Sequence, residues 1–278
     1  MNDLINSEAG RELKENEYIG AEGLIYCSVC NKAKQVVTAM GIFNSMCDCE
    51  RERAEQEAKR QKQIENKQQI NRLTKRCFGY NQIMPKNTFE NSEIKTPAVT
   101  LCFNYCDKWQ EVKAKSINMI LCGNVGSGKT YLACCICNKI ISDYLASAYF
   151  ITEYDFLNGY MSSENKEAYI KDITNCSLLV LDDFGTKCFN KGKANGYLTY
   201  INDLIDTRYK TGKPIVITTN LSKDMFLNNH NTIEEQRIFS RLREMAGRPI
   251  EIKTPDLRLS RADAKADYLK SLLQEGTN

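Results

Sequence analysis

One stretch decides the fold of this chain: Gly123-Asn124-Val125-Gly126-Ser127-Gly128-Lys129-Thr130. It matches the phosphate-binding loop pattern G-x-x-x-x-G-K-[ST] at every fixed position, between the apolar run 119–121 and a helix-like segment. The glycines let the backbone turn tightly and point its N–H groups at an anion, and the N-terminus of the following helix adds partial positive charge. Because pattern and context agree, we prefer this interpretation to a chance glycine-rich turn. The chain is therefore expected to bind a nucleoside triphosphate.

The last two side chains of this loop are expected to contact the nucleotide and its metal ion. Lys129 would reach the β- and γ-phosphates, and the Thr130 hydroxyl would bind Mg²⁺. Residues 123–128 would surround the phosphates with backbone N–H groups. ATP and Mg²⁺ are thus the expected cofactors of this part of the chain.

A second apolar run ends in two carboxylates: Leu178-Leu179-Val180-Leu181-Asp182-Asp183. A buried strand of an open α/β sheet delivers its C-terminal residues to the ligand crevice. Asp182, which follows Lys129 by 53 residues, suits a water-mediated contact with Mg²⁺. Asp183 suits polarising the attacking water. The alternative is an ordinary turn after a core strand, and the phosphate loop upstream makes that the weaker interpretation.

Two later segments offer polar side chains to the same site. Asn220 follows an apolar run that begins at Ile215, and it would orient the attacking water or contact the γ-phosphate. Arg237 and Arg241 are i, i+4 neighbours on a predicted helix and share one face. An arginine supplied by a neighbouring subunit stabilises charge on a transferring phosphoryl group. On spacing alone, a solvated basic helix face is the simpler interpretation of the two arginines.

Helical and strand-like segments alternate from about residue 77 onward. Continuous apolar strands between helices predict an α/β fold, with a parallel sheet sandwiched by helices. The expected strands are 119–122, 148–152, 178–181, 214–219 and 249–252. The expected helices are 99–114, 129–144, 154–173, 194–209 and 233–245.

Four cysteines near the N-terminus form two close pairs. Cys27 and Cys30 make a C-x₂-C pair and Cys47 and Cys49 a C-x-C pair, with sixteen residues between the pairs. Four thiolates suit tetrahedral Zn²⁺, which would supply folding energy that so small a module lacks. An iron–sulfur cluster and free structural thiols are the alternatives. Most of the other cysteines lie in apolar runs, where cysteine behaves as a small buried hydrophobe.

Composition divides the chain into three expected parts: a cysteine-rich module at 1–49, a charged helical linker at 50–76 and an ATPase domain at 77–278. Residues 1 to about 26 look like a polar lead-in, for which a short helix is one interpretation. The linker contains no Gly or Pro, and its nine basic and five acidic side chains give an excess of four positive charges. A solvated helix is the simpler interpretation of the linker, and a contact with nucleic acid or a partner is the alternative.

The sequence contains neither a predicted membrane span nor an export signal. The densest apolar run, 132–141, is shorter than the roughly 20 residues that cross a bilayer. Residues 1–13 are polar and acidic, unlike a signal peptide. We therefore expect a cytoplasmic location, where thiols are normally reduced.

The motifs together resemble a known family. The loop GNVGSGKT, the strand LLVLDDFG, the segment ITTN and the run RIFSRL are similar to those of AAA+ ATPases of the DnaC/DnaI/IstB group. Thr88-Phe89-Glu90 also resembles a short motif ahead of the ATPase core in this group. The resemblance covers about residues 77–260, and it implies an AAA+ P-loop core.

By position, the resemblance assigns roles to the later arginines. Arg241 looks like the arginine finger that acts in trans, and Arg237 like a second arginine of that motif. Arg258 looks like the sensor arginine, with Arg261 as the alternative. Many AAA+ proteins carry Asp-Glu where this chain has Asp182-Asp183, and this group accepts Asp-Asp. The resemblance therefore implies ATP hydrolysis, which we expect to be slow.

The resemblance implies a replicative helicase loader that binds a DnaB-type helicase and single-stranded DNA and self-associates through its ATP sites. In such loaders an N-terminal cysteine-rich module contacts the helicase or DNA. The ATPase motifs scarcely distinguish a loader from an IstB-like transposition ATPase that acts on duplex DNA, although the cysteine module favours the loader. Two further alternatives are a nucleotide-gated adaptor without relevant turnover and a metabolic P-loop kinase.

Overall fold

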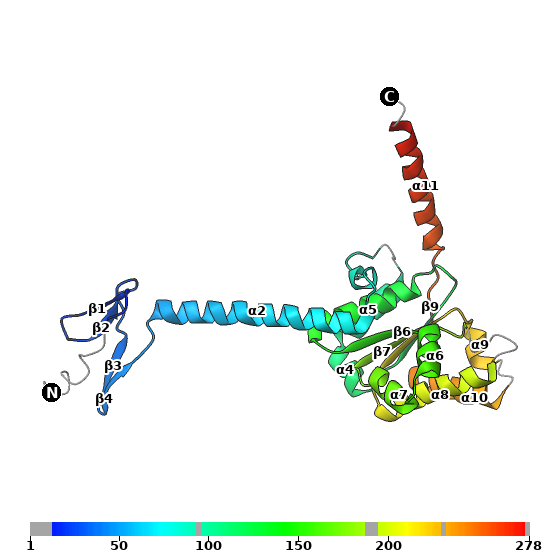
Figure 1. Ribbon diagram of the computed structural model, residues 1–278, viewed down its shortest axis with the longest axis horizontal. Coiled ribbons are helices and arrows are strands. Elements are labelled where there is room, and N and C mark those ends of the chain that lie inside the picture. The colour runs from blue at the N-terminus through cyan, green and yellow to red at the C-terminus, as the bar shows by residue number, and fades with distance from the viewer. Residues whose placement is uncertain (1–12, 93–95, 187–193, 229–231, 276–278) are drawn as a thin grey trace. The chain divides into compact units, whose positions relative to one another are not determined.

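A five-stranded parallel sheet forms the centre of the larger part of the chain (Figure 1). The computed structural model describes residues 13–92, 96–186, 194–228 and 232–275. The strands are β5 Met119–Cys122, β6 Ala148–Thr152, β7 Leu178–Phe184, β8 Ile215–Thr219 and β9 Ile250–Glu251. They lie in the order β6-β7-β8-β5-β9, and every neighbouring pair is parallel. The carboxyl ends of the strands therefore meet at one edge of the sheet, as the α/β prediction requires.

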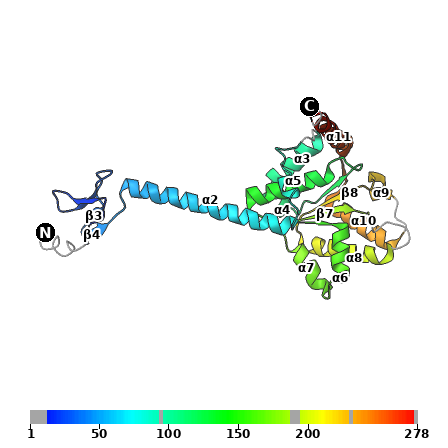
Figure 2. The ribbon, with the colours of Figure 1, turned by 45° about the horizontal axis from the view of Figure 1, so that its top comes forward.

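Helices cover both faces of this sheet, which explains why its central strands are continuous apolar runs. Leu178 and Val180 of β7 pack into one buried cluster, while Leu179 and Leu181 pack into the other. Figure 2 shows α5 and α8 on opposite sides of the sheet. The first cluster includes residues of α3 Pro97–Asp107, α4 Trp109–Ala114 and α5 Lys129–Tyr144. The second includes residues of α6 Glu153–Ser162, α7 Lys166–Thr174, α8 Ala194–Thr211, α9 Lys223–Asn228 and α10 Ile233–Ala246.

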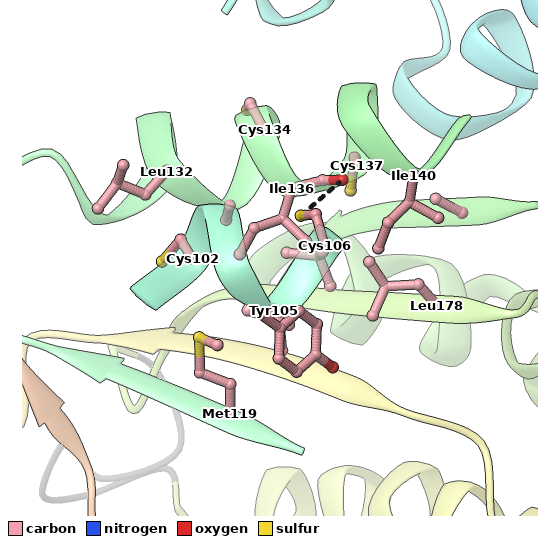
Figure 3. Packing of buried hydrophobic residues seen from close by; sticks show 14 of the residues in the cluster. Cys102, Tyr105, Cys106, Met119, Leu132, Cys134, Ile136, Cys137, Ile140 and Leu178 are labelled. Carbon is pink, nitrogen blue, oxygen red and sulfur yellow. Dashed lines mark hydrogen bonds between the residues drawn. The ribbon is translucent and has the colours of Figure 1, made fainter. Parts of the chain in front are cut away.

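Cysteines fill part of the first cluster (Figure 3). Cys102 and Cys106 lie on α3 and Cys134 and Cys137 on α5, and all four are buried. Figure 3 shows Cys106 against α5, where its Sγ lies 3.9 Å from the carbonyl oxygen of Ile136. Burial raises the pKa of these thiols, to about 12 for Cys102, so they are neutral at physiological pH. The twelve cysteines that the described residues include are all free thiols. The four cysteines of α3 and α5 in this cluster thus act as small apolar residues of the core, as expected from the sequence.

The chain divides between residues 68 and 69 into two compact units. The division falls within one long helix, α2 Asp48–Phe78. The N-terminal unit contains two antiparallel hairpins, β1 Glu17–Ile19 with β2 Ile25–Cys27 and β3 Gln35–Thr38 with β4 Gly41–Asn44. The expected polar lead-in is therefore wrong for residues 17–26, which enter this hairpin structure, and residues 1–12 lie outside the described part.

Two predicted helices prove to be helix pairs. The helix expected at 99–114 ends at Asp107 and restarts at Trp109, where the indole is almost fully buried. The helix expected at 154–173 is interrupted at 163–165, where the Asn165 side chain accepts a hydrogen bond from Ala168 N and begins α7. The C-terminal helix α11 Leu257–Glu275 and the short turn η1 Met84–Lys86 were not expected.

No helix in the described residues combines the length and the apolar composition needed to cross a membrane.

Candidate functional site

The phosphate loop connects β5 to α5 and packs against the segment that precedes α11. Gly126 has φ of 78°, in the left-handed region that residues with side chains rarely adopt. A β-carbon at Gly126 would overlap the Asp256 carboxylate, and one at Gly123 would lie 2.6 Å from the carbonyl oxygen of Ile252. Thr254 Oγ1 also donates a hydrogen bond to the carbonyl oxygen of Ser127 at 2.8 Å. The shape of the loop therefore depends on the segment 252–256 as well as on its own glycines.

Lys129 begins α5, and its ammonium group lies over its own loop. Its Nζ donates to the carbonyl oxygens of Gly123 at 2.9 Å and Asn124 at 2.7 Å. Burial lowers the pKa of Lys129, while the carboxylates of Asp183 and Asp182 act in the opposite direction. A phosphate would exchange these neutral acceptors for anionic oxygens, which form stronger bonds with an ammonium group.

Thr130 and Asp182 face each other across the boundary between α5 and β7. The Thr130 hydroxyl lies 3.0 and 3.1 Å from the two carboxylate oxygens of Asp182. Asp182 is only 2% exposed, and its burial raises the pKa of the carboxyl to about 6, partly offset by hydrogen bonds from Thr218 and Thr130. A hydroxyl and a carboxylate are hard oxygen ligands, so this pair fits Mg²⁺, which keeps several of its waters in protein sites.

Strand β7 contains a bulge at its two aspartates. Leu181 lies opposite Ile217 of β8, but Phe184 lies opposite Thr219, so three steps along β7 correspond to two along β8. A bulge adds one residue to a strand and changes the face to which the following side chains point. Phe184 consequently packs in the same cluster as Leu181, although strict alternation would place them on opposite faces.

Asp183 occupies the irregular position of this bulge. Its φ is 55°, in the left-handed region, which aspartate tolerates better than most residues. Its backbone N–H donates to Thr218 Oγ1 at 3.0 Å. The bulge thus lets Asp183 line a pocket beside the phosphate loop, although its neighbour Asp182 contacts Thr130 on the same side of the sheet.

The backbone just after the bulge is fixed by a buried carboxylate. Glu153, at the start of α6, accepts hydrogen bonds from Gly185 N at 3.1 Å and from Thr186 Oγ1 at 3.0 Å. Thr219 Oγ1 donates to the carbonyl oxygen of Phe184 at 2.7 Å. Residues 184–186 are therefore held by side chains from β8 and α6.

One pocket brings together residues from four separate segments of the chain. Lys129 and Thr130 of α5, Asp183 of β7, Asn220 after β8 and Arg258 of α11 all line it. The loop residues Val125, Gly126 and Gly128 line it as well. Gly123, Asn124 and Ser127 complete the loop, and Ser127 is fully buried. Five of the sequence-based candidates, Lys129, Thr130, Asp183, Asn220 and Arg258, therefore converge at the carboxyl edge of the sheet.

Several residues of the site were not among the candidates. Tyr131 lines the pocket, and its hydroxyl donates to the carbonyl oxygen of Thr88 at 2.8 Å. Leu257 also lines it, and its backbone N–H donates to the carbonyl oxygen of Gly126. Thr218 contacts both aspartates of β7. The motif that begins at Thr88 and the run ITTN, which contains Thr218, were the signals in the sequence.

The two arginines of α10 line a different hollow of the surface. Arg241 forms an ion pair with Asp206 of α8, donates to Asn202 Oδ1 at 3.4 Å and lies 5.6 Å from the Tyr209 ring centre. Arg237 shares this hollow with Arg241. Neither arginine lines the phosphate-loop pocket of its own chain. A residue that acts on a neighbouring subunit is expected to lie outside its own pocket. The side chain of Arg261, the alternative sensor, lies outside the described residues.

The four N-terminal cysteines form one cluster. Their sulfur atoms all lie within 4.8 Å of one another, with Cys49 Sγ 3.5 Å from Cys27 and 3.3 Å from Cys47. Tetrahedral zinc with thiolates separates its sulfurs by about 3.8 Å, so Cys27, Cys30, Cys47 and Cys49 fit this metal. Backbone donors at Cys30 and Val29 lower the pKa of Cys27 to about 6. Hydrogen bonds with Cys47 and Cys27 raise the pKa of Cys49 to about 12.

An ion-pair network braces the same unit. Lys34 Nζ donates to the carboxylates of Glu17 and Glu50, and Lys34 and Glu17 are both buried. Burial alone would lower the pKa of Lys34, but the two carboxylates raise it above its usual range. The network joins β1 to the first turn of α2, next to Cys49.

Comparison with known proteins places the chain in a family. The model of the IstB-like ATP binding proteins matches residues 51–248, more than half of the chain. The chain belongs to this family. The replicative helicase loader DnaC of Escherichia coli strain K12 is 25% identical over 154 residues, and DnaC of Shigella flexneri gives the same values. The match spans 52% of this IstB-like chain and 61% of each of these relatives.

Solved structures share the fold of this IstB-like protein. The crystal structure of DnaI has a TM-score of 0.51 at 19% identity, over 64% of this chain and 94% of that chain. The crystal structure of the DnaC helicase loader has a TM-score of 0.50 at 20% identity, over 62% of this chain and 100% of that chain. The expected AAA+ core, a parallel sheet between helices, is thereby confirmed.

Proposed function

We propose that this chain is an ATP-dependent replicative helicase loader that binds a DnaB-type helicase and single-stranded DNA. The observation that carries the proposal is the single pocket lined by Lys129, Thr130, Asp183, Asn220 and Arg258 in a chain of this family. The identity to DnaC supports the loader role over other uses of ATP. The match covers only 61% of the length of those relatives. The contacts with a helicase and with DNA are therefore proposed for this chain and do not follow from the match alone.

The phosphate loop and the first carboxylate would bind the nucleotide. Backbone N–H groups of residues 123–128 and the Lys129 ammonium hold the phosphates. Thr130 and Asp182 would hold Mg²⁺, directly and through water, and the ion would supply positive charge against the phosphates. The contact between Thr130 and Asp182 already places these two oxygen ligands side by side.

The second carboxylate and its neighbours would act on the water molecule and the γ-phosphate. Asp183 accepts a hydrogen bond from the attacking water, and Asn220 orients that water from the end of β8. Arg258 adds positive charge from α11. Since aspartate reaches less far than glutamate, hydrolysis at this site is slow and is stimulated by assembly or DNA.

The remaining arginines would complete the site of a neighbouring copy. Arg241 stabilises charge on the transferring phosphoryl group of the next subunit, and Arg237 supports it. The surface hollow that holds both arginines is separate from the pocket of their own chain. ATP would therefore bind between subunits, and the oligomer would depend on it.

The N-terminal cysteine module, residues 1–49, would bind one zinc ion through Cys27, Cys30, Cys47 and Cys49. All four zinc positions are then occupied by sulfur, so the metal stabilises the module and has no catalytic role. The module and the linker at 50–76 carry the helicase contact, and residues 77–278 form the ATPase domain. A loader acts in the cytoplasm.

The proposal is tested by association with the helicase. The purified protein is mixed with the DnaB-type helicase of the same organism, with or without ATP, and the mixture is analysed by light scattering after gel filtration. We expect the protein to form a complex with the helicase when ATP is present. Lys129→Ala should lose this complex, and the matched control Lys115→Ala, which changes an exposed lysine at the end of α4, should keep it. The loader role is wrong if the wild-type protein forms no complex with ATP, whether or not single-stranded DNA is present.

A parallel measurement, with duplex DNA in place of the helicase, separates the loader from a transposition ATPase. An IstB-like protein of that kind would instead form ATP-dependent filaments on duplex DNA with a partner transposase. The relatives of this chain named above are helicase loaders, which supports the first function.

A further inference from the structure

Thr218 lies at the centre of the sheet and contacts both aspartates of β7. It is fully buried on β8, between β7 and β5. Its hydroxyl accepts the backbone N–H of Asp183 at 3.0 Å and donates to the carboxylate of Asp182. A hydroxyl has one proton to donate and two lone pairs to accept with, so both contacts are satisfied together. The side chain of one residue thus connects the two carboxylates of the site.

The contact with Asp183 stabilises the bulge. A residue other than glycine stays in the left-handed region only where its surroundings hold it there. The Asp183 N–H belongs to an irregular position of the strand, and Thr218 Oγ1 supplies its acceptor. Without Thr218 Oγ1, the backbone N–H of Asp183 would lose this acceptor next to a buried strand. The bulge would then lose the hydrogen bond that fixes its geometry.

The contact with Asp182 fixes the other carboxylate. Asp182 accepts hydrogen bonds from two hydroxyls, those of Thr130 and Thr218. When Thr130 turns its oxygen toward a cation, it can no longer hold Asp182 in the same way. Thr218 lies on a core strand away from the pocket and keeps its bond, so Asp182 retains its orientation.

We propose that Thr218 is a positioning residue for the ATPase site. Its hydroxyl orients the Asp182 carboxylate toward Thr130, and it holds Asp183 in the bulge that places this side chain in the nucleotide pocket. The inference rests on the proposed ATPase function, and Thr218 acts only through the two aspartates.

Two substitutions separate the hydroxyl from the shape of the side chain. Thr218→Val keeps the volume and the β-branch but removes the hydroxyl, whereas Thr218→Ser keeps the hydroxyl. The deciding measurement is the Mg²⁺ concentration at half-maximal binding of a fluorescent, non-hydrolysable ATP analogue. We expect Thr218→Val to raise this concentration about tenfold, as the loss of one hydrogen bond to a charged group predicts, and Thr218→Ser to stay within about threefold of wild type. The kcat of ATP hydrolysis should fall in Thr218→Val and recover in Thr218→Ser.

Thr174→Val is the matched control, because Thr174 is also buried but its hydroxyl donates to the carbonyl oxygen of Ile170 within α7, away from the pocket. It should leave the Mg²⁺ midpoint unchanged. An unchanged midpoint in Thr218→Val, or a serine variant as impaired as the valine variant, overturns the proposal. Circular dichroism checks folding, and Thr218→Ala replaces the valine variant if that variant does not fold. Absence of hydrolysis in the wild type would refute the proposed ATPase function, while the Mg²⁺ titration would still decide the role of Thr218.

Discussion

Thr130 Oγ1 lies 3.0 Å from one carboxylate oxygen of Asp182 and 3.1 Å from the other. The contact joins the first turn of α5 to strand β7, two elements far apart in the sequence. The Asp182 carboxylate is also almost fully buried, and this burial opposes its ionisation. Burial of the ionised Asp182 carboxylate lowers the free energy of unfolding, and this effect can be measured.

Asp182→Asn should stabilise the protein in the absence of nucleotide at pH 8. The pKa of Asp182 is about 6 in the folded protein against 3.8 for an ordinary aspartate. Between these values the folded state binds more protons than the unfolded state, so the contribution of Asp182 to stability falls as the pH rises from about 4 to 6. Urea unfolding should show a gain of up to about 3 kcal/mol at pH 8 that shrinks toward pH 4. The control Asp172→Asn, which changes an exposed carboxylate on α7, should alter stability by less than about 1 kcal/mol at pH 8. A variant less stable than wild type at pH 8 would contradict the buried-charge argument.

Arg208→Met should strongly destabilise the ATPase domain. Arg208 is fully buried on α8, and its guanidinium donates to the carbonyl oxygens of Thr174, Cys176, Ser177 and Pro214. Methionine would leave these acceptors without a donor, at a cost of about 3 kcal/mol or more in urea unfolding. Lys210→Met, an exposed change on the same helix, should alter stability by less than about 0.5 kcal/mol. Equal losses in the two variants would show that the carbonyl contacts contribute little.

Subunit mixing should reveal whether Arg241 acts on a neighbouring copy. Arg241→Ala should lower ATP hydrolysis by about a thousandfold or more, as loss of an arginine finger does. Lys129→Ala, which loses its own ATP site, should also be inactive. A mixture of the two should recover part of the wild-type rate, because Lys129→Ala subunits still supply Arg241 to Arg241→Ala subunits. Arg248→Ala, an exposed arginine outside α10, serves as the control with full activity. A mixture as inactive as its components would exclude action in trans.

Metal analysis should find one zinc ion per chain, held by the N-terminal cluster. Cys27→Ser and Cys47→Ser should each lose the metal, and a chelator should unfold the N-terminal unit without affecting nucleotide binding. Cys176→Ser, a buried thiol of the ATPase domain, should keep the metal. Iron instead of zinc, or retention of metal in both cluster variants, would overturn the assignment.

Much of the fold could be predicted because its central elements depend on local patterns. The helix at 129–144 and the strand at 148–152 have the bounds expected from the sequence. The two aspartates and Asn220 follow apolar runs, so parallel pairing alone brings them to one edge of the sheet. That Asp183 and Asn220 line a common pocket with Lys129 is a finding of the structure, while the chemical roles of these residues are still predictions.

The features that could not be predicted depend on long-range contacts. The apolar run of β7 stops at Leu181, yet the strand continues to Phe184 through a bulge that only its register with β8 defines. The break between α3 and α4 at Lys108 contains no glycine or proline. It is explained by the burial of Trp109, which depends on tertiary contacts. The N-terminal hairpins were missed because their strands are only three or four residues long, too short for a clear alternating pattern.

Gly126 is not a fixed position of the phosphate-loop pattern, yet its α-carbon lies directly against the Asp256 carboxylate. The same carboxylate accepts the backbone N–H of Arg258 at 2.9 Å. In evolutionary terms these two positions are expected to change together. A relative with a side chain at position 126 should carry a smaller residue at position 256, and a lineage would reach that state by changing Asp256 first.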